Sequence, residues 1–117
     1  NLIRDVRKDL KAPNLPVVIG LMGQNGFKEA QGNTAVVKAA QYSMNKIADF
    51  EGNVKAIPTD IYWDKKADAA YPTWRDNFEA WKRIGSDRPY HYLGSTITFT
   101  RIGRAFGKTM IELRKGK

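Results

Sequence analysis

The chain contains no cysteine and only one histidine, His91. The absence of cysteine excludes disulfides, thiolate catalysis and cysteine-based zinc sites, and it leaves both a reducing and an oxidising compartment open. Because no second histidine is present and the carboxylates show no metal-ligand spacing, we expect no metal and no other cofactor. Acid-base chemistry near neutral pH therefore points to a single side chain.

Long hydrophobic runs are also missing. No stretch of about 18 apolar residues could span a bilayer, so we expect no membrane partner. The first ten residues show neither an initiator methionine nor the charged, apolar and small-residue succession of a signal peptide. The compartment is left open, and we expect that sequence is missing ahead of Asn1.

Acidic residues are fewer than basic ones, with 12 Asp and Glu against 20 Lys and Arg and a formal net charge of +8. Clustered bases would favour a nucleic-acid partner, because they release counterions from phosphates. The bases are instead spread along the chain, and the densest group lies at the C-terminus, where solvated charge is common: Arg114, Lys115 and Lys117. Nucleic-acid binding is therefore disfavoured.

Apolar spacing predicts four helices. They cover residues 2–10, residues from Asn33 or Thr34 to Ala48, residues from Pro72 or Thr73 to Gly85, and residues from Ser95 or Thr96 to Leu113. Residues 15–21 and 53–59 are rich in Val and Ile, and we predict that they are buried strands. A glycine-rich loop, residues 20–32, follows the first strand.

This order of elements is typical of an α/β fold with a parallel sheet covered by helices. The 117 residues suffice for one domain, so residues 1–117 are expected to form a single α/β unit. A parallel sheet of two strands leaves unpaired backbone at its edges. We therefore expect neighbouring strands to come from missing sequence or from another chain, including a second copy in a homo-oligomer.

Residues 85–95 connect two predicted helices and contain the histidine. Asp87 precedes His91 by four residues, and a nearby carboxylate can fix the tautomer of an imidazole and stabilise its charged form. Asp60, at the end of the second strand, is a reserve candidate for this carboxylate. The alternative is that His91 is a loop residue whose ring bonds a backbone carbonyl.

Other polar and aromatic residues have both ordinary and functional interpretations. Ser43, Ser86 and Ser95 are predicted helix-interior, helix-end and capping residues. The Gly23-Gln24-Asn25-Gly26 turn has the composition of an oxyanion-hole loop, although such turns are common. Trp74 and Trp81 stand at helical spacing and are predicted core residues. The predicted loops near the strand ends, where open parallel sheets bind ligands, supply the expected substrate contacts: Asn25, Tyr62, Trp63 and Tyr92.

Two parts of the chain carry a family resemblance. They are the run Asn1-Leu-Ile-Arg-Asp-Val-Arg-Lys-Asp-Leu10 with residues 12–20, and the run Tyr90-His91-Tyr92-Leu93-Gly94-Ser95 leading into residues 102–107. The first resembles the stretch after the third conserved block of sialate O-acetylesterase-like proteins, and the second resembles their final block. These proteins belong to the SGNH superfamily, with carbohydrate esterase family six, and the resemblance covers nearly the whole chain in order.

The resemblance implies a flavodoxin-like sheet, of which this chain would supply roughly the C-terminal half, and a Ser-His-Asp triad that removes acetyl groups from carbohydrate. His91 would be the general base. The family has an aspartate three residues before this histidine, where Arg88 stands here, so Asp87 must reach from one residue further back. The serine block of the family lies ahead of Asn1, and its members are commonly exported.

The alternative is a non-catalytic basic α/β module that binds a partner or oligomerises through its sheet edge.

Overall fold

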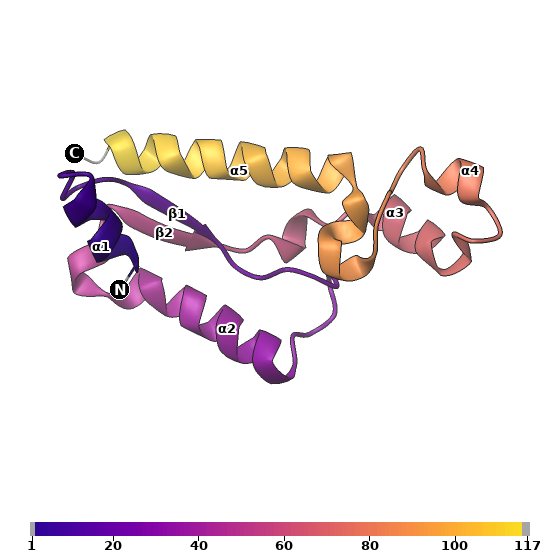
Figure 1. The fold of residues 1–117 in the computed structure, drawn as a ribbon, viewed down its shortest axis with the longest axis horizontal. Helices are drawn as coiled ribbons and strands as arrows, with labels where there is room; N and C mark the ends of the chain where they lie inside the picture. The colour runs from indigo at the N-terminus through magenta and orange to yellow at the C-terminus, as the bar shows by residue number, and fades with distance from the viewer. Residues whose placement is uncertain (1, 116–117) are drawn as a thin grey trace.

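The computed structural model of the chain describes residues 2–115 and places a small parallel sheet between two helices (Figure 1). Strands β1 (Val17–Gly20) and β2 (Val54–Ile57) pair in register. Helix α2 (Gly32–Ser43) covers one face and helix α5 (Thr96–Lys115) covers the other. This arrangement agrees with the predicted α/β class and with the predicted parallel pairing.

Helix α5 lies close to the end of β1, and Gly20 makes that approach possible. A Cβ atom at Gly20 would come within 2.8 Å of the Phe106 ring. The absence of a side chain therefore lets an aromatic residue of α5 rest on the strand backbone. As predicted, the last helix begins beside Ser95, whose Oγ accepts a hydrogen bond from the amide of Thr98 at 3.4 Å.

The first two helices are shorter than predicted. Helix α1 covers Leu2–Asp9, and α2 ends at Ser43 where the prediction continued to Ala48. Two 3-10 turns follow, η1 (Met44–Lys46) and η2 (Ala48–Phe50), separated by Ile47 in an extended conformation. Helical periodicity is overridden here because the side chain of Asn45 bonds the backbone of β2.

The predicted helix over residues 72–85 is wrong. The structure has α3 (Lys65–Ala70), a 3-10 turn η4 (Tyr71–Thr73) and a short α4 (Phe78–Trp81) in this region. Asp64 starts the earlier helix by accepting hydrogen bonds from the amides of Lys66 and Ala67. Pro72 lies inside η4, where its ring opposes further helix.

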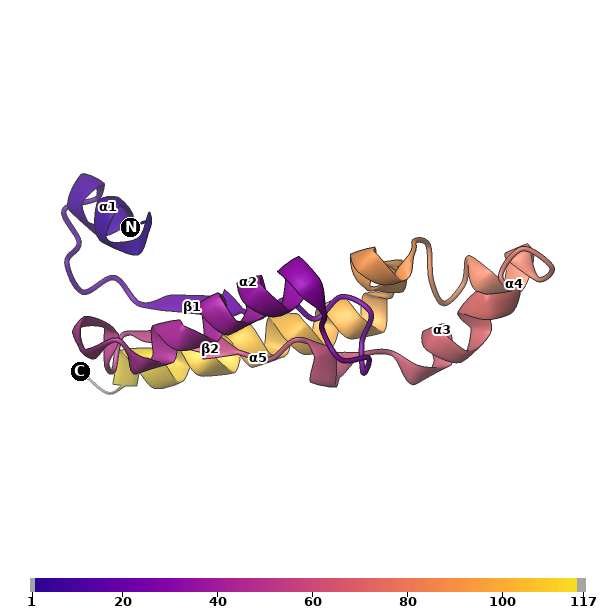
Figure 2. The same cartoon turned by 90° about the horizontal axis from the view of Figure 1, so that it is seen from below.

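The fold is elongated, since α3 and α4 extend away from the sheet (Figure 2). Its extents are 52 × 30 × 22 Å and its radius of gyration is 16.9 Å, whereas a compact chain of 100 residues has a radius of about 13 Å. We call α3 and α4 the arm. The main buried cluster lies where the arm joins the rest of the fold and contains Trp63, Ala67, Trp81 and Leu93. The sheet itself has little covering beyond α2 and α5.

Candidate active site around His91

His91 belongs to a strained turn, η5 (Pro89–Gly94). The three residues after it adopt left-handed backbone conformations, with φ of 55° at Tyr92, 59° at Leu93 and 58° at Gly94. A bulky residue in this region costs about 1 kcal/mol or more, and such strain concentrates at functional sites. The Leu93 side chain is fully buried and its carbonyl accepts the amides of Ser86 and Asp87, so the surrounding contacts hold the turn.

The structure brings His91 and Asp87 together. Nδ1 of His91 lies 2.9 Å from Oδ2 of Asp87. A carboxylate only accepts hydrogen bonds, so this contact assigns the proton of the neutral ring to Nδ1 and leaves Nε2 with a lone pair. The edge-on ring of Tyr90, with its centroid 4.5 Å from that of His91, further limits the imidazole. The side chains of His91 and Asp87 are 63% and 45% exposed.

Asp87 is held in its charged form by its neighbours. The pKa of its carboxyl is lowered from the ordinary 3.8, first by the backbone amide of Arg88, which donates to Oδ1 at 2.7 Å, and then by the hydrogen bond with His91. The additional residue between Asp87 and His91 therefore does not prevent the contact. Since the folded pKa is the lower one, the ionised carboxylate stabilises the turn above about pH 4, and this contribution is lost as the pH falls through the folded value.

We expect an NMR titration of the Asp87 carboxyl carbon to give a midpoint below 3.8. In His91→Ala the midpoint should rise only part of the way, because the Arg88 amide is the larger cause and remains in place. Asp68→Asn, at an exposed position on α3, is the control variant and should leave the Asp87 midpoint unchanged. A full return of Asp87 to its ordinary value would contradict this order of causes.

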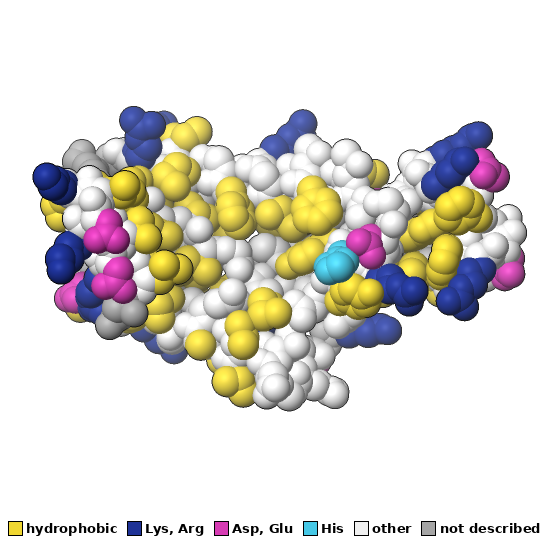
Figure 3. Space-filling view, in the orientation of Figure 1, with side chains coloured by type: hydrophobic (Ala, Val, Ile, Leu, Met, Phe, Trp, Pro, Cys, Tyr) yellow, Lys and Arg dark blue, Asp and Glu magenta, His cyan; other side chains and the backbone are white. Residues whose placement is uncertain are grey.

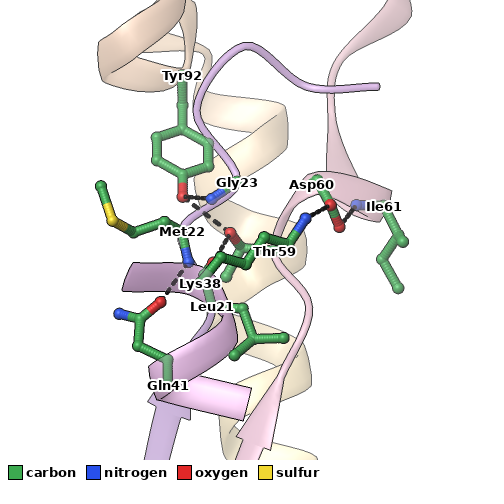
Figure 4. A network of polar contacts seen from close by, with 9 residues as sticks. All are labelled: Leu21, Met22, Gly23, Lys38, Gln41, Thr59, Asp60, Ile61 and Tyr92. Atoms are coloured by element: carbon green, nitrogen blue, oxygen red, sulfur yellow. Dashed lines mark hydrogen bonds and ion pairs between the residues drawn. The ribbon is translucent and has the colours of Figure 1, made fainter. Parts of the chain in front are cut away.

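Tyr92 joins η5 to the carboxyl ends of both strands (Figure 4). Its hydroxyl accepts from the amide of Gly23 at 2.9 Å, and it lies 2.8 Å from Oγ1 of Thr59, which donates to the carbonyl of Leu21 at 2.6 Å. Leu21 follows β1 and Thr59 follows shortly after β2. The turn that carries His91 is thus fixed at the sheet end where open parallel sheets bind ligands.

Three of the four backbone amides in the turn at residues 23–26 already have hydrogen-bond partners. The amide of Gly23 donates to Tyr92, that of Asn25 donates to the Pro89 carbonyl at 3.3 Å, and that of Gly26 donates to the Gly23 carbonyl at 3.1 Å. An oxyanion needs free donors, and these three are occupied. The exposed Asn25, at φ 68°, reaches the histidine turn through its backbone.

Trp63 was expected to contact substrate. It is instead buried, with only 2% of its surface exposed. Gly26 passes directly over it, and a Cβ atom there would lie 2.5 Å from the indole. The residue therefore closes the core beneath the turn. Tyr92 lies beside it with ring centroids 5.9 Å apart, while Tyr62, in η3 (Asp60–Tyr62), is half-exposed. Within residues 2–115 no hydrogen bond or ring contact joins Tyr62 to His91.

An aromatic pocket of about 110 Å³ adjoins Asp87. It is lined by residues from η4, α4 and the loops that follow them: Tyr71, Trp74, Trp81, Ser86, Asp87 and Arg88. Trp81 is buried, as predicted, whereas Trp74 is only half-buried and lines this pocket. Helical spacing assigned both tryptophans to the core. Pro72 argues against a single helix over this segment, and this signal could have indicated that Trp74 and Trp81 do not share one buried helix face.

The remaining polar candidates have other partners. Oγ of Ser43 donates to the carbonyl of Ala40, and Oγ of Ser86 donates to that of Gly94. Ser95 is fully buried and its Oγ donates to Asp64 at 2.7 Å. Asp60, the reserve carboxylate, pairs with Lys38 and accepts the amide of Ile61 (Figure 4). Among residues 2–115 the carboxylate that contacts His91 is Asp87.

Comparisons with protein-family models, with curated proteins and with solved structures find no match to this chain. Across residues 2–115, no group of three or more histidine and carboxylate side chains is placed to hold a metal ion. None of the helices in that part of the chain is both long and apolar enough to cross a bilayer.

Proposed function

We propose that this chain carries the acid-base part of a serine esterase that hydrolyses O-acetyl esters on carbohydrate, and that its fold is part of a flavodoxin-like SGNH sheet. The observation that carries the proposal is the His91–Asp87 pair, with Nδ1 2.9 Å from the carboxylate and Nε2 turned away from it. A triad needs that orientation of its base. The serine would come from sequence outside these 117 residues or from another chain, because Ser43, Ser86 and Ser95 have other hydrogen-bond partners.

In this mechanism Nε2 of His91 takes the proton of the serine hydroxyl while the serine oxygen attacks the acetyl carbonyl. The imidazolium that forms is stabilised by Asp87. It then returns the proton to the sugar oxygen, which leaves as the alcohol. In the second half, Nε2 takes a proton from water as the water oxygen attacks the acetyl-serine carbonyl, and the imidazolium then returns that proton to the serine oxygen as the bond to the acetyl group breaks and acetate is released.

The pocket beside Asp87, and not the buried Trp63, is the sugar-binding surface in this proposal. Half-buried aromatic rings can stack on sugar faces and remain accessible, and Tyr71 and Trp74 meet both conditions. Tyr62 and Asn25 remain accessible at the same end of the sheet and are secondary candidates. Arg88, at the pocket wall, supplies hydrogen-bond donors for sugar hydroxyls.

The experiment compares p-nitrophenyl acetate hydrolysis by the chain with hydrolysis by His91→Ala and Asp87→Asn. Without its own nucleophile the chain should be slow, but faster than His91→Ala by about tenfold or more, because a positioned base contributes at least that much. Asp87→Asn should lose part of the rate, and Asp68→Asn is the matched control. In a protein that joins this chain to a serine block, His91→Ala should lower kcat on an acetylated sugar by about 1000-fold or more.

Two results would contradict the proposal. One is an esterase rate that does not change in His91→Ala. The other is an ordinary esterase turnover by the chain alone that disappears when Ser43, Ser86 or Ser95 is replaced by alanine. The second result would show that the nucleophile is present and that its assignment elsewhere is wrong.

A further inference from the structure

The two edges of the sheet differ, and the β2 edge is closed by a side chain. Asn45, in η1, donates from Nδ2 to the carbonyl of Ala56 at 3.0 Å, and its Oδ1 accepts the amide of Ala56 at 2.8 Å. The carboxamide thus makes both hydrogen bonds that a neighbouring strand would make at this residue. Further strand addition at the β2 edge is blocked.

The β1 edge has no such cover. The amides of Val17 and Leu21 donate to Asn53 and Ile57, so alternate residues of β1 face β2. By the alternation of a parallel ladder, the backbone groups of Val18 and Gly20 point away from β2. Within residues 2–115 no strand lies on that side, and all four residues of β1 are only half-buried.

The surface beside the β1 edge is apolar. In Figure 1 β1 lies nearer the viewer than β2, and Figure 2 shows α1 standing out on the same side. Apolar side chains form a band across this face between α5 and α2, while most Lys and Arg side chains lie toward the ends (Figure 3). Helix α1 and the residue after it add exposed apolar side chains, with Leu2 77% and Leu10 64% accessible.

The exposed surface of the chain, part of which belongs to the extended α3 and α4, is large enough to include an interface. The chain exposes 8214 Å², whereas a compact monomer of 13.2 kDa exposes about 6,400 Å². The excess of about 1,800 Å² is larger than the roughly 800 Å² that each partner contributes to an ordinary interface. An interface of this size, apolar at its centre and charged at its rim, resembles those of stable homodimers.

We propose that the β1 edge binds the β1 edge of a second copy about a two-fold axis. The strands run antiparallel, Val18 of each copy exchanges two backbone hydrogen bonds with Gly20 of the other, and Ile19 lies at the axis. A four-stranded sheet results, in the order β2, β1, β1, β2. The second copy is the occupant because an edge strand is self-complementary under a two-fold and because Asn45 closes the other edge, so assembly stops at two.

Sedimentation equilibrium at 10–100 μM tests the proposal on the unmodified chain, where we expect twice 13.2 kDa. Because the net charge of +8 opposes association, the dimer should tighten as salt is raised. Val18→Pro removes an outward amide and leaves the bonds to β2 intact, and its dimer should dissociate about 100-fold more readily. Asn45→Ala opens the second edge, and it should give assemblies larger than a dimer.

Hydrogen exchange supplies a test that needs no variant. The amides of Val18 and Gly20 should exchange faster on dilution, while the amide of Ile19, which faces β2, should change much less. A monomer throughout the concentration range overturns the proposal, as does a dimer in which those two amides exchange as freely as in the monomer. None of these measurements depends on catalysis. Because Asn45 closes the β2 edge, a serine-bearing segment that extends the sheet would have to bind the β1 edge, and its addition should therefore dissociate the dimer.

Discussion

Replacing Asp64 with alanine lowers the free energy of unfolding by about 3–5 kcal/mol. Asp64 is only 3% exposed, and its Oδ1 accepts the amides of Lys66 and Ala67 at the start of α3. Its Oδ2 accepts the hydroxyl of the buried Ser95 at 2.7 Å. The substitution leaves three donors without this partner, and two of them, the Ala67 amide and the Ser95 hydroxyl, are buried, where each unsatisfied group costs about 1–3 kcal/mol.

Urea unfolding followed by far-UV circular dichroism measures this loss. Asp68→Ala, on the exposed side of the same short helix, is the control and should stay within about 0.5 kcal/mol of the parent chain. Because natural domains are stable by only about 5–15 kcal/mol, this loss is a large fraction of the total and should shift the urea midpoint of Asp64→Ala well below that of the parent chain. A loss below about 1 kcal/mol would show that the carboxylate does not hold these donors.

The same residue links the arm to the candidate site. Asp64 bonds Ser95, which follows Gly94 at the end of the histidine turn, and its amide donates to Oγ1 of Thr98 in α5 at 3.1 Å. Asp64 therefore holds the residue that follows η5 and the first turn of α5, and these contacts help to keep Tyr92 and Leu93 in their strained conformations. Loss of Asp64 should loosen the position of His91 as well as destabilise the fold.

Local patterns predicted the parts of the fold that depend on neighbouring residues. The Val and Ile runs gave both strands, and Ser95 gave the start of α5. The contact between Asp87 and His91 also follows from proximity in the chain, since the two residues are four apart. Asp64 was a missed helix start, although an aspartate before an alanine-rich stretch is an ordinary capping signal.

Contacts between distant residues could not be predicted in this way. Tyr92 and Gly23 are separated by 69 positions, and no periodicity shows that the tyrosine hydroxyl meets that amide. Likewise, Asn45 breaks the expected helix because it bonds Ala56 in β2, a partner that only the folded chain brings near. Spacing predicts which face of an element is apolar, but it does not show what packs against that face.

Trp63 shows the limit most clearly, and its replacement by alanine should lower the free energy of unfolding by about 3–5 kcal/mol. The residue follows a strand in an irregular segment, a position that suggested sugar binding, yet it lies under Gly26 and against the Tyr92 ring. Alanine there leaves a large cavity in the main buried cluster. The same urea measurement applies, and Trp74→Ala, at a half-buried position, should cost much less.

Phenylalanine at position 63 separates packing from hydrogen bonding. The indole Nε1 of Trp63 is buried and has no hydrogen-bond partner. Trp63→Phe therefore removes volume without breaking a polar contact, and it relieves an unsatisfied donor, so it should cost less than half of the alanine loss. If Trp63 instead contacted sugar, Trp63→Ala would leave stability unchanged and weaken only substrate binding. That result would return Trp63 to the substrate rim and would show that the turn at residues 23–26 does not close over it.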